Sequence, residues 1–197
     1  MARAARGSRV GHRPPTLWLA RDAHAAMLRE AVQRHPHETG GVLLGYAGDG
    51  DDVVVTAVVG PGPNAVHERS RFVPDHAHHE SEVARLYEQS GRRWTYLGDW
   101  HTHPDTMAYL SATDAETLES IAGAEAARVP WPVMVILGQH PGAPVGRERP
   151  RRLAGEHWYV RAWRYARRRA LLGRITRGRP TDADARRCEV ALFNAPA

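Results

Sequence analysis

Residues 98–114 read GDWHTHPDTMAYLSATD and hold two histidines, a serine and an aspartate. The β-prone run TYLGDWHTH predicts a strand over residues 95–103. Successive side chains of a strand alternate between its two faces, so His101 and His103 should point the same way. The stretch therefore places two imidazoles side by side at the end of a predicted strand.

Pro104 is expected to end this strand and turn the chain outward through a six-residue loop. Ser111 and Asp114 have the spacing of the first turn of a helix, from which Asp114 can reach back toward the histidines. Two imidazoles and one carboxylate suit a zinc site that keeps its fourth position open for water, the arrangement of catalytic zinc. Interpretations without a metal ion stay open, because Ser-x-x-Asp resembles a helix capping box and His-x-His also occurs in strands that bind no ligand.

Strand and helix signals alternate along the chain outside this stretch. We expect a strand and helix over residues 17–34, a hairpin of 41–47 and 52–60, a helix over 75–90 capped by Asp75, a helix over 111–127, a buried strand over 132–138 and a further strand over 157–165. The predicted fold class is α/β, with a mixed, curved β-sheet. The helix near residue 25 is expected on one side of this sheet and the helix near residue 118 on the other.

Composition limits the protein to one domain with extensions. The chain has 197 residues, 42% hydrophobic and 25% charged, and no run of 18 apolar residues. The N-terminus has arginines without a following apolar segment, so we expect no membrane association and a cytoplasmic location. The single cysteine, Cys188, excludes an internal disulfide and a multi-cysteine zinc site.

The predicted organisation is a flexible N-terminus (1–14), one domain (15–165) and a basic C-terminal extension (166–197). From residue 147 onward the chain carries fourteen arginines against five acidic residues. This basic segment, with its aromatic residues, has the composition of a nucleic-acid contact. The composition is more typical of a solvated basic tail whose aromatic residues pack on the core. The last ten residues are predicted to be disordered.

The polar residues together resemble the JAMM signature of the JAB/MPN metallopeptidases. Glu38 precedes His101-Thr-His103-Pro104, seven residues separate His103 from Ser111, and two more lead to Asp114. The similarity of order covers roughly residues 17–140. Four stretches are most similar to bacterial members encoded beside ubiquitin-like conjugation enzymes: ETGGVLLG, GPGPNA, RFVPDHAHHE and YLGDWHTHP.

The resemblance implies a single JAB/MPN-like metallopeptidase domain with one Zn²⁺ per chain, held by His101, His103 and Asp114. Glu38 would be the general base, and Ser111 would donate a hydrogen bond to the oxyanion. The implied reaction cleaves the bond after the C-terminus of a ubiquitin-like modifier or a similarly conjugated protein, in a bacterial conjugation or antiphage system. The implied partners are that modifier or its conjugate, together with activating-like and conjugating-like enzymes of the same operon.

Other interpretations of these residues lead to different functions. A non-catalytic JAB-fold scaffold, or a nucleic-acid-associated protein acting through its basic C-terminus, would not need all five site residues, so their presence favours the enzyme. A second metal site could use His76 with His79 or Glu80, although structural or solvent-facing roles explain these residues as well. Zinc deaminases are excluded because they need a Pro-Cys-x-x-Cys motif.

Overall fold

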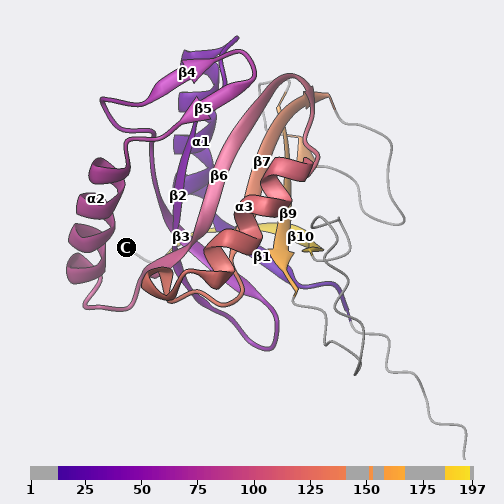
Figure 1. The fold of residues 1–197 in the computed structure, drawn as a ribbon. Helices are drawn as coiled ribbons and strands as arrows, with labels where there is room; N and C mark the ends of the chain where they lie inside the picture. The colour runs from indigo at the N-terminus through magenta and orange to yellow at the C-terminus, as the bar shows by residue number, and fades with distance from the viewer. Residues whose placement is uncertain (1–12, 141–150, 153–157, 167–184, 196–197) are drawn as a thin grey trace, which may run out of the picture.

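The computed structural model describes residues 13–140, 151–152, 158–166 and 185–195. This part of the chain forms an eight-stranded mixed sheet and a separate two-stranded hairpin (Figure 1). The sheet has the order β10-β1-β3-β2-β6-β7-β9-β8, and β4 and β5 form the hairpin. The strands are β1 (Thr16–Ala20), β2 (Gly40–Ala47), β3 (Val53–Val59), β4 (Val66–Glu68), β5 (Arg71–Val73), β6 (Thr95–Met107), β7 (Val133–His140), β8 (Arg151–Arg152), β9 (Tyr159–Tyr165) and β10 (Ala185–Phe193), and the helices are α1 (Arg21–Arg34), α2 (His76–Gln89), α3 (Ala112–Gly123) and the 3₁₀ turn η1 (Glu125–Ala127).

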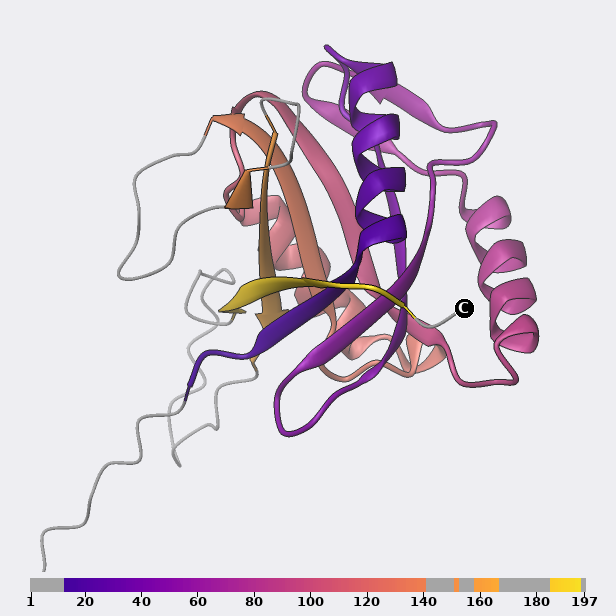
Figure 2. The same cartoon turned by 180° about the vertical axis from the view of Figure 1, so that it is seen from behind.

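Helices cover both faces of the sheet, as the sequence predicts. On β7, Val133, Val135 and Leu137 pack in the core cluster that contains α1, whereas Met134 and Ile136 pack against α3. This alternation places α1 and α3 on opposite faces. Figure 1 shows the face of the sheet that carries α3, with α2 at its edge. Figure 2 shows the opposite face, which carries α1.

The sheet curls until its two ends meet. β10 pairs in parallel with β1 over Thr16–Ala20, and its first residues also pair antiparallel with β9. Seven strands are thereby linked in a ring around the α1 side of the core. The curvature of the expected mixed sheet is confirmed, and it is stronger than the sequence indicated.

Most predicted elements are present, with two changed boundaries. β6 continues through Pro104 to Met107, because its register against β7 shifts after His103 and pairing resumes at Met107. The helix predicted over residues 111–127 ends at Gly123 and is followed by the short turn η1. Asp75 caps α2 as expected, since its side chain accepts a hydrogen bond from the backbone of His78.

The sheet extends beyond residue 165, where a basic extension was predicted to begin. β10 lies within that segment, so residues 188–193 of the ten C-terminal residues predicted to be disordered belong to a strand. Its outward residues are charged while Cys188 is buried, which masks the strand signal in the sequence. Residues 1–12 of the predicted flexible N-terminus and residues 167–184 of the basic extension lie outside the described residues. None of the described helices is long and apolar enough to span a membrane.

Candidate metal centre

β6 directs its histidines to the face of the sheet that carries α3. Thr102, between them, is fully buried on the other face. Its backbone N–H donates to the carbonyl of Thr39, and its hydroxyl oxygen accepts a hydrogen bond of 3.0 Å from the backbone N–H of Thr39. This pair of bonds fixes the segment before β2 beside the histidines, and that segment carries Glu38.

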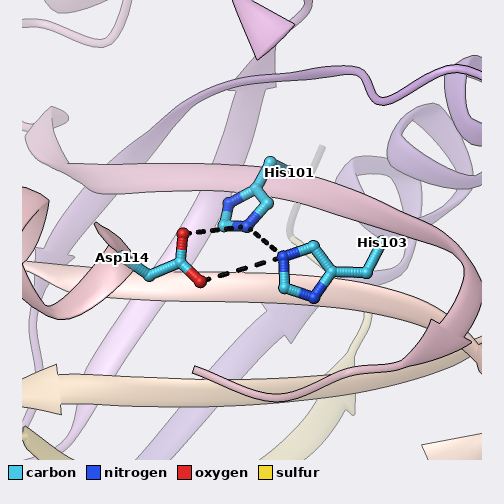
Figure 3. Close-up of side chains that lie close together, drawn as sticks. All are labelled: His101, His103 and Asp114. Atoms are coloured by element: carbon cyan, nitrogen blue, oxygen red, sulfur yellow. Dashed lines mark hydrogen bonds and ion pairs between the residues drawn. The ribbon is translucent and has the colours of Figure 1, made fainter. Parts of the chain in front are cut away.

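The predicted ligands converge on one point (Figure 3). The Nε2 atom of His101 lies 3.0 Å from Nε2 of His103 and 3.3 Å from an oxygen of Asp114. The other oxygen of Asp114 lies 3.8 Å from Nε2 of His103. All three side chains are largely shielded from solvent, with 9–14% of their side-chain surface exposed. Among the described residues, they form the one group of three or more metal-binding side chains with ligand atoms within 4.8 Å.

These distances fit a zinc ion. Zn–N and Zn–O bonds of about 2.0–2.1 Å in a tetrahedron put neighbouring ligand atoms roughly 3.3 Å apart. The separations of 3.0 Å between the two Nε2 atoms and 3.3 Å between Nε2 of His101 and the nearer Asp114 oxygen are close to that value. Two facing imidazole nitrogens can form a mutual hydrogen bond only if one of them carries a proton, whereas a cation accepts both lone pairs. The donor set of two imidazoles and a carboxylate therefore suits a divalent metal.

Ser111 and Asp114 satisfy the capping interpretation and the ligand interpretation together. The hydroxyl oxygen of Ser111 accepts from the backbone N–H of Asp114, and one Asp114 oxygen accepts from the backbone N–H of Ser111 at 2.8 Å. This capping box fixes the carboxylate at the first turn of α3. Because the Ser111 oxygen acts there as an acceptor, the cap does not use its O–H, which lies beside the Asp114 carboxylate and helps to lower the pKa of that group.

The pKa shifts of His103 and Asp114 favour the protonation states that bind a cation. Burial and, to a smaller extent, the charge of His101 lower the pKa of His103 to about 4, so its imidazole is neutral at pH 7. Burial acts to raise the pKa of Asp114, but hydrogen bonds from His101 and Ser111 outweigh it and hold the pKa well below its usual range. A neutral imidazole and an ionised carboxylate are the forms that bind metals.

Glu38 and Ser111 line the same cleft as the three ligands, a cavity of about 710 Å³. The backbone N–H of Glu38 donates to the carbonyl of Glu68 at 2.7 Å, so the β4–β5 hairpin holds Glu38 in place. Burial raises the pKa of Glu38; the charge of His101 lowers it and that of Asp114 raises it. A carboxylate with a raised pKa is a better proton acceptor than an ordinary glutamate.

Comparison with known proteins identifies the family. Residues 20–154 match the model of the prokaryotic homologs of the JAB domain. The chain belongs to this family. A probable metalloprotease of Sinorhizobium fredii, y4qB, is 37% identical over 165 residues, covering 83% of this chain and 87% of that protein.

Other relatives match a smaller part of the chain. A CD-NTase/cGAS isopeptidase of Vibrio cholerae is 39% identical over 77 residues, which cover 39% of this chain and 49% of that protein. One from Escherichia coli is 32% identical over 105 residues, covering 49% and 67%. The solution structure of a Desulfitobacterium hafniense protein has a TM-score of 0.57 at 21% identity, covering 91% of this chain and 94% of that one, which shows the fold alone.

These matches confirm the expected enzyme class. The protein is a hydrolase of the peptidase type, and its relative's name together with the His-His-Asp cluster indicates a metal.

The second metal site considered for His76 and His79 is explained better by a structural contact. Nε2 of His79 bonds the carbonyl of Gly60 at 2.8 Å, and burial lowers its pKa, so His79 is a structural residue that joins α2 to the end of β3.

Three residues that complete the cleft of the JAB domain were not predicted from the sequence. Asp99 lies two residues before His101, accepts a hydrogen bond of 2.7 Å from the Tyr96 hydroxyl and lines the cavity. Its alternation with His101 and His103 would have placed it on their face of β6. Arg69 and Phe72 of the β4–β5 hairpin also line the cavity, and no local signal assigns a hairpin tip to a distant site.

Proposed function

We propose that the protein is a zinc-dependent isopeptidase that hydrolyses the bond after the C-terminus of a ubiquitin-like modifier or a similarly conjugated protein. The observation that carries the proposal is the convergence of His101, His103 and Asp114 in a cleft that also contains Glu38. The CD-NTase/cGAS isopeptidases among its relatives support a role in a bacterial conjugation or antiphage system. A conjugate of that kind is the first substrate class to test.

His101, His103 and Asp114 would hold the zinc ion through two Nε2 atoms and a carboxylate oxygen. Bound zinc supplies Lewis-acid chemistry and makes water nucleophilic near neutral pH. The remaining work falls to the protein. The capping box of α3 and the Thr39–Thr102 bonds fix the ligands before any ion binds, so little reorganisation is needed.

Glu38 is the proposed general base. It would take a proton from the attacking water and deliver it to the leaving amine. Its backbone is tied both to the hairpin and, through Thr39, to β6, so its carboxylate stays on the cleft wall. Ser111 would donate its O–H to the carbonyl oxygen of the scissile bond, since the helix cap uses only the hydroxyl oxygen, as an acceptor.

The first test measures metal content and cleavage. Protein expressed with sufficient zinc should contain about one zinc per chain by elemental analysis, and His101→Ala, His103→Ala and Asp114→Ala should lose it together with activity. His140→Ala is the matched control, because this histidine is exposed at the end of β7 and outside the cluster. The substrates are conjugates made with the modifier and target encoded beside the gene, and zinc-free wild-type protein would contradict the proposal.

A further inference from the structure

The ligands of the candidate metal centre come from two elements that are joined by a short connection. His101 and His103 belong to β6, and Asp114 belongs to the first turn of α3. Whether Asp114 reaches the histidines therefore depends on the path of residues 108–111. A displacement of about 1 Å at this point would open the ligand set, because catalytic geometries tolerate about half an ångström.

A buried arginine holds the middle of this connection. Arg161 on β9 is 6% exposed, and its guanidinium donates a hydrogen bond of 3.0 Å to the carbonyl of Ala108. Arg161 lies opposite Ile136 in the β7–β9 register, on the face that carries α3. Its side chain therefore reaches across the sheet to the chain that leads into Ser111.

The connection also passes directly over a glycine of β7. A Cβ atom at Gly138 would lie 2.2 Å from the backbone nitrogen of Ala108 and 2.5 Å from the carbonyl carbon of Met107. Real Cβ atoms do not approach backbone this closely, so only glycine lets the connection rest on the strand. Ala108 and Leu110 are then buried beside Leu118 of α3.

We propose that Arg161 and Gly138 are positioning residues of the metal centre. Gly138 allows the connection to lie against β7, and the Arg161 guanidinium fixes the Ala108 carbonyl there. Together they set the distance between the capping box of α3 and the histidines of β6. The proposal rests on the proposed metal-dependent function, and neither residue touches substrate or metal.

Removing a group that hydrogen-bonds a metal ligand typically weakens metal affinity or activity by about 10–100-fold. We expect a loss of the same order when the connection that carries Asp114 is displaced. Arg161→Met keeps the volume of the side chain but leaves the buried carbonyl without this donor, whereas Arg161→Lys keeps one ammonium donor. Gly138→Ala pushes the connection away from the strand by a different route. Both kinds of change should move Asp114 away from the histidines.

The experiment measures the zinc dissociation constant by competition with a chelator, and amide hydrogen exchange of residues 108–115. Arg161→Met and Gly138→Ala should each weaken zinc binding by about 10–100-fold and speed exchange in this segment. Arg161→Lys should restore part of both. In conjugate cleavage at saturating zinc, kcat should fall more than KM changes, because the cleft that binds substrate is left intact.

Two controls separate positioning from general destabilisation. Leu19→Ala removes a fully buried side chain from the α1 core, so it should lower the melting temperature with unchanged zinc affinity. Gly123→Ala adds a Cβ with no atom within 4 Å and should change neither property. If wild-type protein binds zinc while Arg161→Met and Gly138→Ala bind it equally well, the positioning role is refuted and the proposed function stands. Wild-type protein that binds no zinc refutes the proposed function itself.

Discussion

Glu38 lines the cleft, but it does not belong to the cluster of possible metal ligands formed by His101, His103 and Asp114. We therefore expect Glu38 to have a different role from these three residues. As a general base it should touch water rather than metal. We expect Glu38→Gln to retain zinc and melting temperature while losing about 100-fold to 10,000-fold in turnover. Zinc analysis, thermal melting and conjugate cleavage, compared with wild type and the exposed-residue control Glu116→Gln, measure these effects.

Two outcomes would contradict the role given to Glu38. Cleavage at the wild-type rate would mean that another group accepts the proton. Loss of zinc would mean that the carboxylate is a ligand and that the site is assembled differently.

The clustering of His101, His103 and Asp114 was predictable from local rules because each rule acts over a few positions. Strand alternation places His101 and His103 together, and the capping box places Asp114 at a helix start. Arg161 could not be found in this way, since β9 meets the connection before α3 only through the sheet. No sequence spacing identifies a residue that supports a site from a distant strand.

At the scale of elements, the β2–β3 turn is tied to β1 by one carboxylate. Asp52 accepts hydrogen bonds from the backbone N–H of Thr16 at 2.8 Å, from Arg13 and from the indole N–H of Trp18. Burial acts to raise the pKa of Asp52, but these bonds outweigh it, so the pKa is lowered. The folded state therefore favours the ionised carboxylate.

A lowered pKa gives a pH dependence of definite sign. Stability from Asp52 should be fully present above the unfolded aspartate pKa of about 3.9, and should be lost as pH falls through the lower folded value. Asp52→Asn should thus reduce the free energy of unfolding at pH 7 by about 0.5–1.5 kcal/mol, and the difference from wild type should shrink at pH 3. Denaturant titrations at both pH values measure it. If the difference were unchanged at pH 3, the Asn variant would be destabilised by altered packing and not by the loss of the carboxylate charge. Asp49→Asn in the same turn is the control.

Element types were easier to predict than element ends. The β2–β3 hairpin and α2 are set by turn residues and an N-cap that lie within the segment itself. The end of β6 depends instead on its pairing with β7, which resumes at Met107 after the shift beyond His103. Pro104 signals a break because it lacks an N–H, and the pairing of the neighbouring residues overrides that signal.

At the scale of the whole molecule, the strand order is a product of long-range pairing. β1 pairs in parallel with both β3 and β10, strands that are far from it in the sequence. Hydrophobic periodicity shows that a segment is a strand and does not show its neighbour. The closing of the sheet by β10 therefore lay beyond what the sequence could indicate, although the two helix layers did not.

β10 should be essential to the fold because it closes the sheet between β1 and β9. Cys188 is 1% exposed, and Val190 and Leu192 pack against the core that contains Leu17 and Leu19. Removing residues 185–197 would expose this core and leave β1 with an unpaired edge. We expect the truncated protein to be insoluble or to lack a cooperative unfolding transition, because the typical stability of a domain is only about 5–15 kcal/mol.

A pair of point variants on this strand tests the same conclusion without shortening the chain. Val190→Asp places an unpaired charge where the partly buried Val190 packs against the core, and it should lower the free energy of unfolding by about 1–3 kcal/mol. Glu189→Asp, on the neighbouring exposed position, should change it by less than about 0.5 kcal/mol. Denaturant titration and circular dichroism compare the two variants. A soluble truncated protein with wild-type melting, or equal effects of the two variants, would show that β10 is an appendage, in which case the domain would end near residue 165 after all.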